Sequence, residues 1–270
     1  MSDELGLVFD RVPEEYERGR RGYPRELVEA ACEIAALRAN SHVVGVGCGT
    51  GKLTRVLAER GLRIEAIDPS AQLVRVAQRH VEESAVQFHV SRFEDLELPA
   101  SAFAAVFAAT AFHWVDPAVG WSKVARLLRR GGVFVLLTHT IELDPEMLAA
   151  WREVLPEAGT WVSRDVRTLW EGAEARMDNV SELWAWLVKR DIGRPEAATL
   201  FGDVQLRSVK IERTETVAEL LGQIRTQSAY LRLDVEGQLQ LEQRIKSAIE
   251  KLGGTHRSEQ FAVLVTARRA

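Results

Sequence analysis

A glycine-rich run at residues 43–51 (VVGVGCGTG) is the stretch best suited to bind a ligand through its backbone. Glycines such as Gly47 and Gly49 let the main chain approach a bound molecule more closely than a side chain would allow. An apolar run typical of a buried strand, His42–Val46, precedes the loop, and a helical pattern begins at Leu53. The start of such a helix offers free N–H groups and the positive end of the helix dipole. The run therefore predicts a ligand-binding turn between a strand and a helix.

A single carboxylate, Asp68, stands where the next predicted strand, Arg63–Ile67, ends. From that position in a parallel sheet, an acid can accept hydrogen bonds from both hydroxyls of a ribose. The alternative interpretation is a tight turn whose aspartate only caps the following helix. The loop and the acid together favour a nucleoside site.

The glycine spacing separates this loop from two other nucleotide sites. A P-loop needs Ser or Thr after Gly-Lys, but Leu53 follows Lys52, so a magnesium ion would have no hydroxyl ligand. A dinucleotide site has the spacing Gly-x-Gly-x-x-Gly, and this loop, Gly47-x-Gly49-x-Gly51, is one residue tighter. A dinucleotide-dependent oxidoreductase is therefore a less favoured hypothesis.

The tighter loop resembles motif I of the class I S-adenosylmethionine-dependent methyltransferases. Further stretches extend the resemblance over roughly residues 9 to 140. They are Asp68-Pro69-Ser70, which resembles the ribose-binding strand end, Arg92–Pro99, which resembles the stretch that contacts adenine, and Ala111–Trp114 with Leu127–Gly132. The lead-in at residues 9–24 resembles that of a bacterial branch, methyltransferase type 11-like, which acts on small molecules.

The resemblance implies a site for S-adenosyl-L-methionine, with S-adenosyl-L-homocysteine as the product. In this site Asp68 would hold the ribose, Glu94 would contact the adenine amino group, and Arg20 would lie near the cofactor carboxylate. The expected cofactor contacts are Tyr16, Arg20, Gly45, Gly47, Cys48, Gly49, Gly51, Asp68, Pro69, Phe93, Glu94 and Thr110.

Two positions depart from the family pattern. Motif I usually carries an acid where this chain has Gly45, and strand four commonly reads Phe-Asp where this chain has Phe103-Ala104. Loss of the acid removes about one charge-assisted hydrogen bond, or about 1.5–3 kcal/mol of binding free energy. Either neighbours such as Arg20 and Tyr16 hold the cofactor without it, or the protein binds S-adenosylmethionine weakly and is weakly active or non-methylating.

His113 is the predicted general base, a group needed only if the acceptor must lose a proton. It follows the fourth predicted strand, at the edge where open α/β sheets bind ligands, and its ordinary pKa lies near neutrality. The alternative is a structural histidine beneath the pocket. His139 follows the fifth strand at the same edge and is expected to contact substrate. The sequence has no His-Glu-x-x-His pattern or acidic cluster, so no metal is expected.

Five of the seven tryptophans fall between the fifth and sixth predicted strands. They are Trp151, Trp161, Trp170, Trp184 and Trp186. Aromatic side chains supply a large apolar area, so we expect Trp151 and Trp161 to contact an apolar or aromatic small acceptor. The alternative is that these tryptophans only form the core of their own segment.

The elements that must position these residues alternate between strands and helices as far as Thr138. We predict helices at Pro24–Leu37, Leu53–Glu59, Ser70–His80 and Pro117–Leu128, the last stopped by Gly131-Gly132, and strands at His42–Val46, Arg63–Ile67, Val86–Val90, Phe103–Ala109 and Val133–Thr138. Helical segments follow at Glu146–Leu155, Ser163–Trp170 and Ser181–Lys189, then a strand at Val204–Ile211, helices at Val217–Thr226 and Val235–Leu252, and a strand at Gln260–Thr266.

This order predicts an α/β fold with a Rossmann-like doubly wound sheet of seven strands, mostly parallel with an antiparallel last strand, plus a helical lid insertion. Residues 1–140 and 200–270 are expected to form the S-adenosylmethionine-binding domain, and residues 141–199 the lid.

Composition narrows the class of protein further. The 270 residues carry a formal charge of −4, with 46% hydrophobic and 27% charged residues. This is an ordinary globular mix whose charge disfavours nucleic-acid binding. The two cysteines make no disulfide framework or zinc pattern, and no apolar run approaches the length of a membrane span. Met1–Asp10 does not resemble a signal peptide. We expect a cytoplasmic monomer or homodimer whose partner is a small-molecule methyl acceptor.

Overall fold

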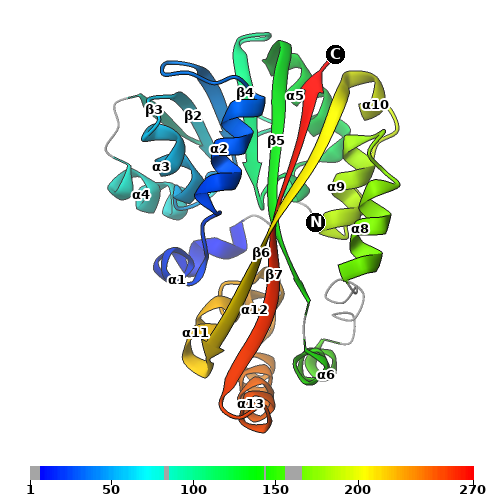
Figure 1. The fold of residues 1–270 in the computed structure, drawn as a ribbon. Helices are drawn as coiled ribbons and strands as arrows, with labels where there is room; N and C mark the ends of the chain where they lie inside the picture. Colours follow the sequence, from blue (N-terminus) through cyan, green and yellow to red (C-terminus); the bar gives the residue numbers. More distant parts are fainter. Residues whose placement is uncertain (1–6, 82–84, 143, 156–165) are drawn as a thin grey trace.

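The computed structural model describes residues 7–81, 85–142, 144–155 and 166–270. At its centre is a seven-stranded sheet in the order β3-β2-β1-β4-β5-β7-β6 (Figure 1). The strands are β1 (His42–Val46), β2 (Arg63–Asp68), β3 (Val86–Val90), β4 (Phe103–Ala109), β5 (Leu128–Glu142), β6 (Phe201–Thr216) and β7 (Thr255–Arg269). The first five pair in parallel, whereas β7 pairs antiparallel with both β5 and β6. The predicted fold class is confirmed.

Helices surround this sheet, some on its two faces and others in a separate group beyond one end of it. They are η1 (Leu7–Arg11), α1 (Pro13–Gly19), α2 (Arg25–Ile34), α3 (Lys52–Ala58), α4 (Ala71–His80), η2 (Phe112–Trp114), α5 (Pro117–Leu127), α6 (Pro145–Val154), α8 (Val166–Glu174), α9 (Val180–Val188), α10 (Ala197–Leu200), α11 (Val217–Ile224), α12 (Ser228–Leu231) and α13 (Val235–Lys251). Buried side chains of α2 and α3 pack on one face of β1, β4 and β5. Those of α5, α8 and α9 pack on the other face.

Local sequence signals set several of these boundaries. The Ser70 hydroxyl accepts a hydrogen bond from the Leu73 N–H at 3.0 Å, which begins α4 where the sequence predicts it. Asp116 caps α5 in the same way, through the Ala118 N–H at 2.9 Å, and Pro117 occupies the first helical position. β4 is buried at all but its last residue, as a central parallel strand should be.

The fifth strand begins earlier than predicted. β5 starts at Leu128, directly after α5, so Gly131 and Gly132 lie inside the strand and do not stop the helix. The β4–β5 register shifts between Phe103 and Ala105, and Gly131 takes a left-handed φ of +71°. The glycines therefore serve an irregularity in the strand, a use of glycine that the pattern of apolar residues does not distinguish from a helix end.

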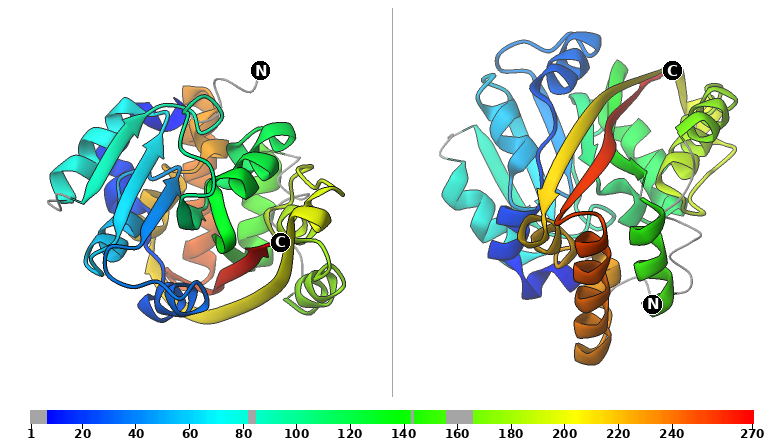
Figure 2. Two further views of the ribbon diagram at one scale, coloured as in Figure 1. Left: turned by 90° about the horizontal axis from the view of Figure 1, so that it is seen from above. Right: turned by 60° about the horizontal axis from the view of Figure 1, so that its bottom comes forward.

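The two last strands are also longer than predicted, at 16 and 15 residues. Their pairing continues to Thr216 opposite Thr255, and Figure 2 shows them running together past the other strands towards α11 and α13. The added stretch of β6 alternates charged and polar residues, mostly exposed or half-buried, so its hydrophobicity is low although its period is that of a strand.

A further group of helices, here called the cap, is made of η1, α1, α6, α11, α12 and α13, and the five α-helices lie towards the bottom of Figure 1, around the far ends of β6 and β7. Its apolar core includes Phe9, Trp151, Leu221 and Ile245. The predicted lid segment, residues 141–199, thus contributes α6 to the cap, whereas α8 and α9 pack against the sheet. No helix in the described part of the chain is long and apolar enough to cross a membrane.

Candidate active site

Three cavities adjoin one another at the carboxyl ends of the strands, and each is named here after one residue that lines it. The Asp68 cavity and the Gly45 cavity share the glycine loop and Tyr16. The Gly45 cavity and the His113 cavity share Arg20 and His139. Thr110, at the end of β4, lines all three. Thr110 therefore marks the point where these spaces meet.

The glycine loop has the conformation that its residue types suggest. Gly47, Gly49 and Gly51 have φ values of +65°, +54° and +82°, in the left-handed region that favours glycine. A Cβ on Gly47 would lie 2.3 Å from the Cβ of Ala111, so the loop tolerates no side chain there. Gly47, Cys48 and Gly49 line cavities, but Gly51 lines none of the three. Gly51 directly precedes α3, and a Cβ there would lie 3.1 Å from the Cβ of Ala77 in α4.

Asp68 lies under this loop with its side chain buried. Its two carboxylate oxygens accept hydrogen bonds from the backbone N–H of Gly49 at 2.8 Å and of Ser70 at 2.9 Å. Each oxygen keeps a lone pair, since a carboxylate can accept about four hydrogen bonds. Burial raises the pKa of Asp68 to about 6, against the opposing effect of those two N–H groups. Asp68 and Pro69 both line the Asp68 cavity.

Phe93 and Glu94 line the opposite side of the Asp68 cavity. Glu94 Oε1 accepts a hydrogen bond from the Asp116 N–H at 2.8 Å and lies 3.2 Å from Arg92 Nη2. The loop that carries both residues is held by Lys123 of α5, whose Nζ donates to the carbonyl oxygens of Glu94 at 2.8 Å and of Leu96 at 2.7 Å. Lys123 was not a predicted site residue, because a lone lysine in an amphipathic helix gives no sign that its ammonium is buried.

Two predicted residues of the lead-in reach the cavities from α1 and its end. Tyr16 lines both the Asp68 and the Gly45 cavity. The Arg20 guanidinium lies 5.3 Å from the centre of the Tyr16 ring and donates to the Thr226 carbonyl oxygen at 2.7 Å. The Arg20 Nε is buried and has no hydrogen-bond partner among the described residues. Arg20 thus joins α1 to the end of α11 and keeps one donor available at the cavity wall.

Gly45 lies in β1 and lines the Gly45 cavity together with Arg20. A Cβ at this position would meet nothing within 4 Å. The missing motif I acid is therefore not replaced by another side chain that fills its place.

The predicted catalytic histidine, His113, lines the third cavity. Burial, together with Arg190 and Arg20, lowers its pKa to about 3. The pKa of His139 is lowered to about 4, again mainly by burial, and its ring stacks on Tyr23 at 4.5 Å between ring centres. Both rings are neutral at pH 7 and bind a proton weakly. The geometry thus brings His113 to a cavity wall, but its electrostatics suit hydrogen bonding better than proton abstraction.

Of the four described tryptophans between β5 and β6, one lines a cavity, and the other three pack into the core against the central sheet and not only into a core of their own segment. Trp151 is 3% exposed and lines the His113 cavity from α6. Trp184 is fully buried in the core under α9, and Trp170 and Trp186 pack against the same core. Trp161 lies outside the described residues.

The His113 cavity also has a polar wall that sequence reasoning missed. It consists of Glu215, Gln223, Gln227, His256, Ser258 and Gln260, from β6, α11, the turn between α11 and α12, and β7. In β7 the residues at 256, 258 and 260 are buried and alternate with exposed ones, but all the residues from 255 to 260 are polar, so the sequence carries no alternating signal there. No group of three or more His, Cys, Asp or Glu side chains suited to a metal ion occurs within the described ranges.

Comparison with known proteins places this site in context. Residues 44–136 match a family described as "Methyltransferase domain". An uncharacterized methyltransferase of Mycobacterium tuberculosis is 37% identical over 137 residues, covering 51% of this chain and 54% of that protein. The chain thus spans about half the length of the curated relatives it matches first.

Two solved structures share the fold. A putative type II methyltransferase from Anaeromyxobacter dehalogenans superposes with a TM-score of 0.60 at 24% identity, covering 92% of this chain and 97% of that chain. Phosphoethanolamine N-methyltransferase 2 of Haemonchus contortus, in complex with phosphomonomethylethanolamine and S-adenosylhomocysteine, gives 0.53 at 15% identity, covering 97% of this chain and 59% of that one.

Proposed function

We propose, from the premise that this chain carries a class I methyltransferase domain, that it transfers a methyl group from S-adenosylmethionine to oxygen or nitrogen of a small molecule. The observation that carries the proposal is the arrangement at Thr110. There the cavity of the glycine loop and Asp68 adjoins a second cavity with an apolar wall. A methyl donor and an acceptor could therefore meet at the carboxyl edge of the sheet.

The residues present fit the cofactor. The glycine loop leaves room for a ligand against the backbone, and Asp68 keeps a lone pair on each oxygen for the two ribose hydroxyls. Glu94 lines the same cavity as Asp68 and is proposed to contact the adenine, and Arg20 Nε is the proposed donor to the carboxylate of the methionine part. When bound, S-adenosylmethionine supplies an electrophilic methyl group, and the protein supplies proximity and orientation.

The acceptor would bind in the His113 cavity. Met147, Trp151, Leu187, Leu220 and Phe261 give it apolar surface, which favours an apolar or aromatic body. In the proposal, neutral His113 orients the acceptor by a hydrogen bond, and His139 contributes to the wall near Thr110. The net charge of −4 disfavours a nucleic acid as the methyl acceptor.

Other parts of the proposal concern the whole protein. Residues 141–199 are proposed to act as a lid, in which α6 closes over the acceptor. A cytoplasmic location accords with the two free thiols, Cys32 and Cys48. We retain a monomer or homodimer as the proposed assembly.

A second function is favoured by one observation, the unfilled space at Gly45. A protein that lacks the motif I acid could bind S-adenosylmethionine weakly and not methylate. Such a protein would differ from a methyltransferase in binding S-adenosylmethionine without forming a methylated product.

The test combines binding with turnover. Calorimetry should detect S-adenosylmethionine and S-adenosylhomocysteine binding to the purified protein, and mass spectrometry should detect methylated products in a panel of phenols and amines. Asp68→Asn should remove most of the binding, whereas Asp178→Asn, an exposed aspartate of the same size, should not. Binding without any methylated product would support the second function, and no heat at millimolar ligand would refute both.

A further inference from the structure

Three residues of the polar wall face the His113 cavity alone. Glu215, His256 and Ser258 line this cavity and neither of the other two. All three are buried, with 2%, 1% and 7% of their surface exposed. They come from the part of the β6–β7 ladder that extends beyond the other strands. If the cofactor occupies the Asp68 and Gly45 cavities, these side chains are left to contact the acceptor.

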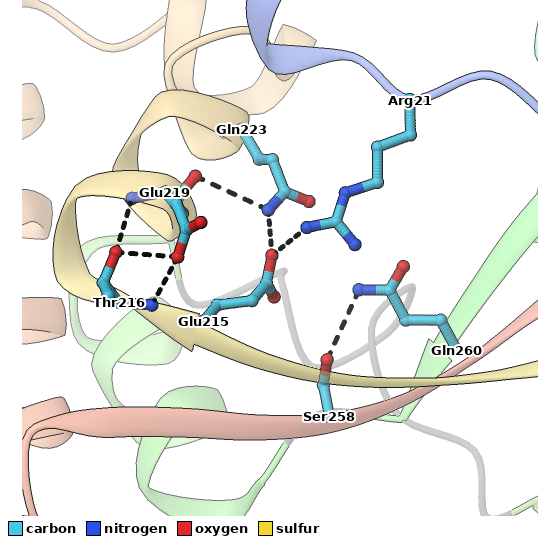
Figure 3. Close-up of polar contacts among 7 residues, drawn as sticks. All are labelled: Arg21, Glu215, Thr216, Glu219, Gln223, Ser258 and Gln260. Atoms are coloured by element: carbon cyan, nitrogen blue, oxygen red, sulfur yellow. Dashed lines mark hydrogen bonds and ion pairs between the residues drawn. The ribbon is translucent and has the colours of Figure 1, made fainter.

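Only one of the two carboxylate oxygens of Glu215 has hydrogen-bond partners in the described part of the chain. Its Oε1 accepts hydrogen bonds from the guanidinium of Arg21 and from the side-chain amide of Gln223 (Figure 3). Its Oε2 is buried and has no hydrogen-bond partner in the described part of the chain. A buried acceptor without a donor destabilises a protein by the full cost of its desolvation. The free oxygen is therefore a place where a ligand donor would be bound.

His256 lies directly opposite Glu215 in the β6–β7 ladder. Both of its ring nitrogens are buried, and neither has a partner among the described side chains and backbone groups. Burial lowers the pKa of His256, so the ring is neutral at pH 7. A neutral imidazole has one N–H donor and one nitrogen acceptor. Across the ladder from the Glu215 carboxylate, His256 thus offers a donor that no group in the described part of the chain uses.

The charges around Glu215 decide which ligand group would fit. Arg21 neutralises Glu215, and Arg20, Arg21 and Arg213 all act on His139 in the adjoining wall. A ligand carboxylate would face the free oxygen of Glu215, and an ammonium group would face Arg20, which lines the same cavity, and Arg21, which is paired with Glu215. A neutral group that both donates and accepts one hydrogen bond avoids both repulsions, and a hydroxyl is the simplest such group.

We propose that Glu215 and His256 form a subsite for a hydroxyl group on the acceptor, whose apolar body lies against Trp151, Leu220 and Phe261. The hydroxyl donates to Glu215 Oε2 and accepts from the His256 ring N–H. That this hydroxyl belongs to the methyl acceptor rests on the proposed function. The existence of a hydroxyl-binding subsite at Glu215 and His256 does not.

Four naphthalene derivatives test the subsite at pH 7: 2-naphthol, 2-methoxynaphthalene, naphthalene-2-carboxylate and 2-naphthylmethylammonium. Their affinities are measured by calorimetry with the full chain, both with and without saturating S-adenosylhomocysteine. We expect 2-naphthol to bind about tenfold more tightly than the methoxy compound, the equivalent of one hydrogen bond to a buried charged group.

The decisive variant is Glu215→Gln. Because Arg21 and Gln223 both donate to the inner oxygen, the new amide must direct its oxygen at them and its NH₂ group into the cavity. The subsite acceptor becomes a donor, so the preference for naphthol over the methoxy compound should fall to about one. His256→Asn should weaken naphthol binding but should not abolish the preference for naphthol over the methoxy compound. Glu212→Gln, an exposed carboxylate on the same strand, is the matched control and should change nothing.

The outcomes separate the two proposals. Equal affinity of the wild type for naphthol and its methyl ether, tighter binding of the carboxylate or the ammonium compound, or no binding of any of the four up to millimolar concentration would overturn the subsite. The same holds if Glu215→Gln leaves the preference intact while its thermal midpoint shows a folded protein. Failure of S-adenosylhomocysteine to bind would refute the proposed function and leave the naphthol measurements valid.

Discussion

Asp68 is the residue on whose charge the proposed cofactor site depends. Burial holds its pKa at about 6, above the ordinary value of an aspartate, so the ionised form is only modestly favoured at neutral pH. A carboxylate accepts stronger hydrogen bonds from the ribose hydroxyls than a protonated carboxyl group does. Ligand binding and protonation therefore compete at this side chain.

The first prediction is that affinity for S-adenosylhomocysteine falls as the pH drops through about 6 and is about tenfold lower at pH 5 than at pH 7. His113 and His139, with pKa values of about 3 and 4, stay neutral over that range and do not contribute. Calorimetry between pH 5 and pH 8 measures the effect, and Asp68→Asn should bind weakly with no such slope. A wild-type affinity that stays level down to pH 5 would contradict it.

Gly45 provides a second test at the same scale. A side chain added there enters open space in an extended strand, and Arg20 lines the same cavity. We predict that Gly45→Asp binds S-adenosylmethionine about tenfold more tightly, through one charge-assisted hydrogen bond. Gly45→Asn has nearly the same shape without the charge and should gain little. Equal affinities of both variants and the wild type, measured by calorimetry, would show that the missing acid has no bearing on binding.

Between elements, the loop and the neighbouring 3₁₀ turn are fitted to each other. A methyl group on Gly47 would overlap the Cβ of Ala111, and the left-handed φ adds strain. We predict that Gly47→Ala lowers the free energy of unfolding by about 2–4 kcal/mol and abolishes S-adenosylhomocysteine binding.

Adding Ala111→Gly should recover part of the stability, since it removes the contact but not the strain. Gly222→Ala, where an added Cβ meets nothing within 4 Å in α11, is the control and should be neutral or stabilising. Urea denaturation gives the comparison, and a double variant no more stable than Gly47→Ala would argue against the contact.

Lys123 shows how one helix supports a loop that belongs to the site. Its buried ammonium binds two carbonyl oxygens of the loop and lies 5.3 Å from the centre of the Phe93 ring. We predict that Lys123→Met lowers the free energy of unfolding by about 2–3 kcal/mol, because two carbonyl groups lose a charged donor.

The same change should weaken S-adenosylhomocysteine binding, since Phe93 and Glu94 lose their support. Ser122→Ala, on the exposed side of α5, should affect neither urea denaturation nor calorimetry. Weaker binding at unchanged stability would mean that Lys123 acts on the ligand directly and not through the loop.

At the scale of the whole molecule, the cap is closed by contacts between distant parts of the chain. Arg20 donates to the Thr226 carbonyl oxygen at 2.7 Å, and Arg21 is paired with Glu215. These contacts join the N-terminal segment to the connection between β6 and β7, over the cavities that both line. Cofactor binding should therefore order the two segments together.

We predict that S-adenosylhomocysteine at about 100 times its Kd raises the midpoint of thermal unfolding by about 5–10 °C. Hydrogen exchange should slow in α1 and α11, which carry cavity residues, and should be unaffected in α5 away from the loop contacts. Protection spread evenly over all helices would indicate global stabilisation only, without closure of the cap.

Much of the sheet could be predicted because its central strands and turns are local signals. Three strands, including the one before the glycine loop, have the predicted bounds, and Ser70 caps the predicted helix. The wrong element bounds arose where the local pattern fits two structures or where a strand is mostly polar. Gly131 was assigned to a helix end but serves a strand irregularity, and the charged end of β6 was too polar to be recognised as part of a strand.

The site divides in the same way. Asp68 and the loop glycines were found from sequence because a backbone-binding turn needs those residue types in that order along the chain. Whether His113 could act as a base was decided only by the structure, since its pKa depends on burial and on Arg20 and Arg190, which come from other segments. The polar wall at Glu215 and His256 has no sequence motif at all.

The sequence by itself thus determined the seven-stranded fold and the local geometry of the glycine loop with Asp68. The tertiary structure alone decided which side chains meet in the His113 cavity, which of the described ones are left without partners, and how burial sets their charge. The physical reason is range: turn and strand preferences act between neighbours along the chain, whereas desolvation and pairing act between residues that only folding brings together, such as Arg21 and Glu215.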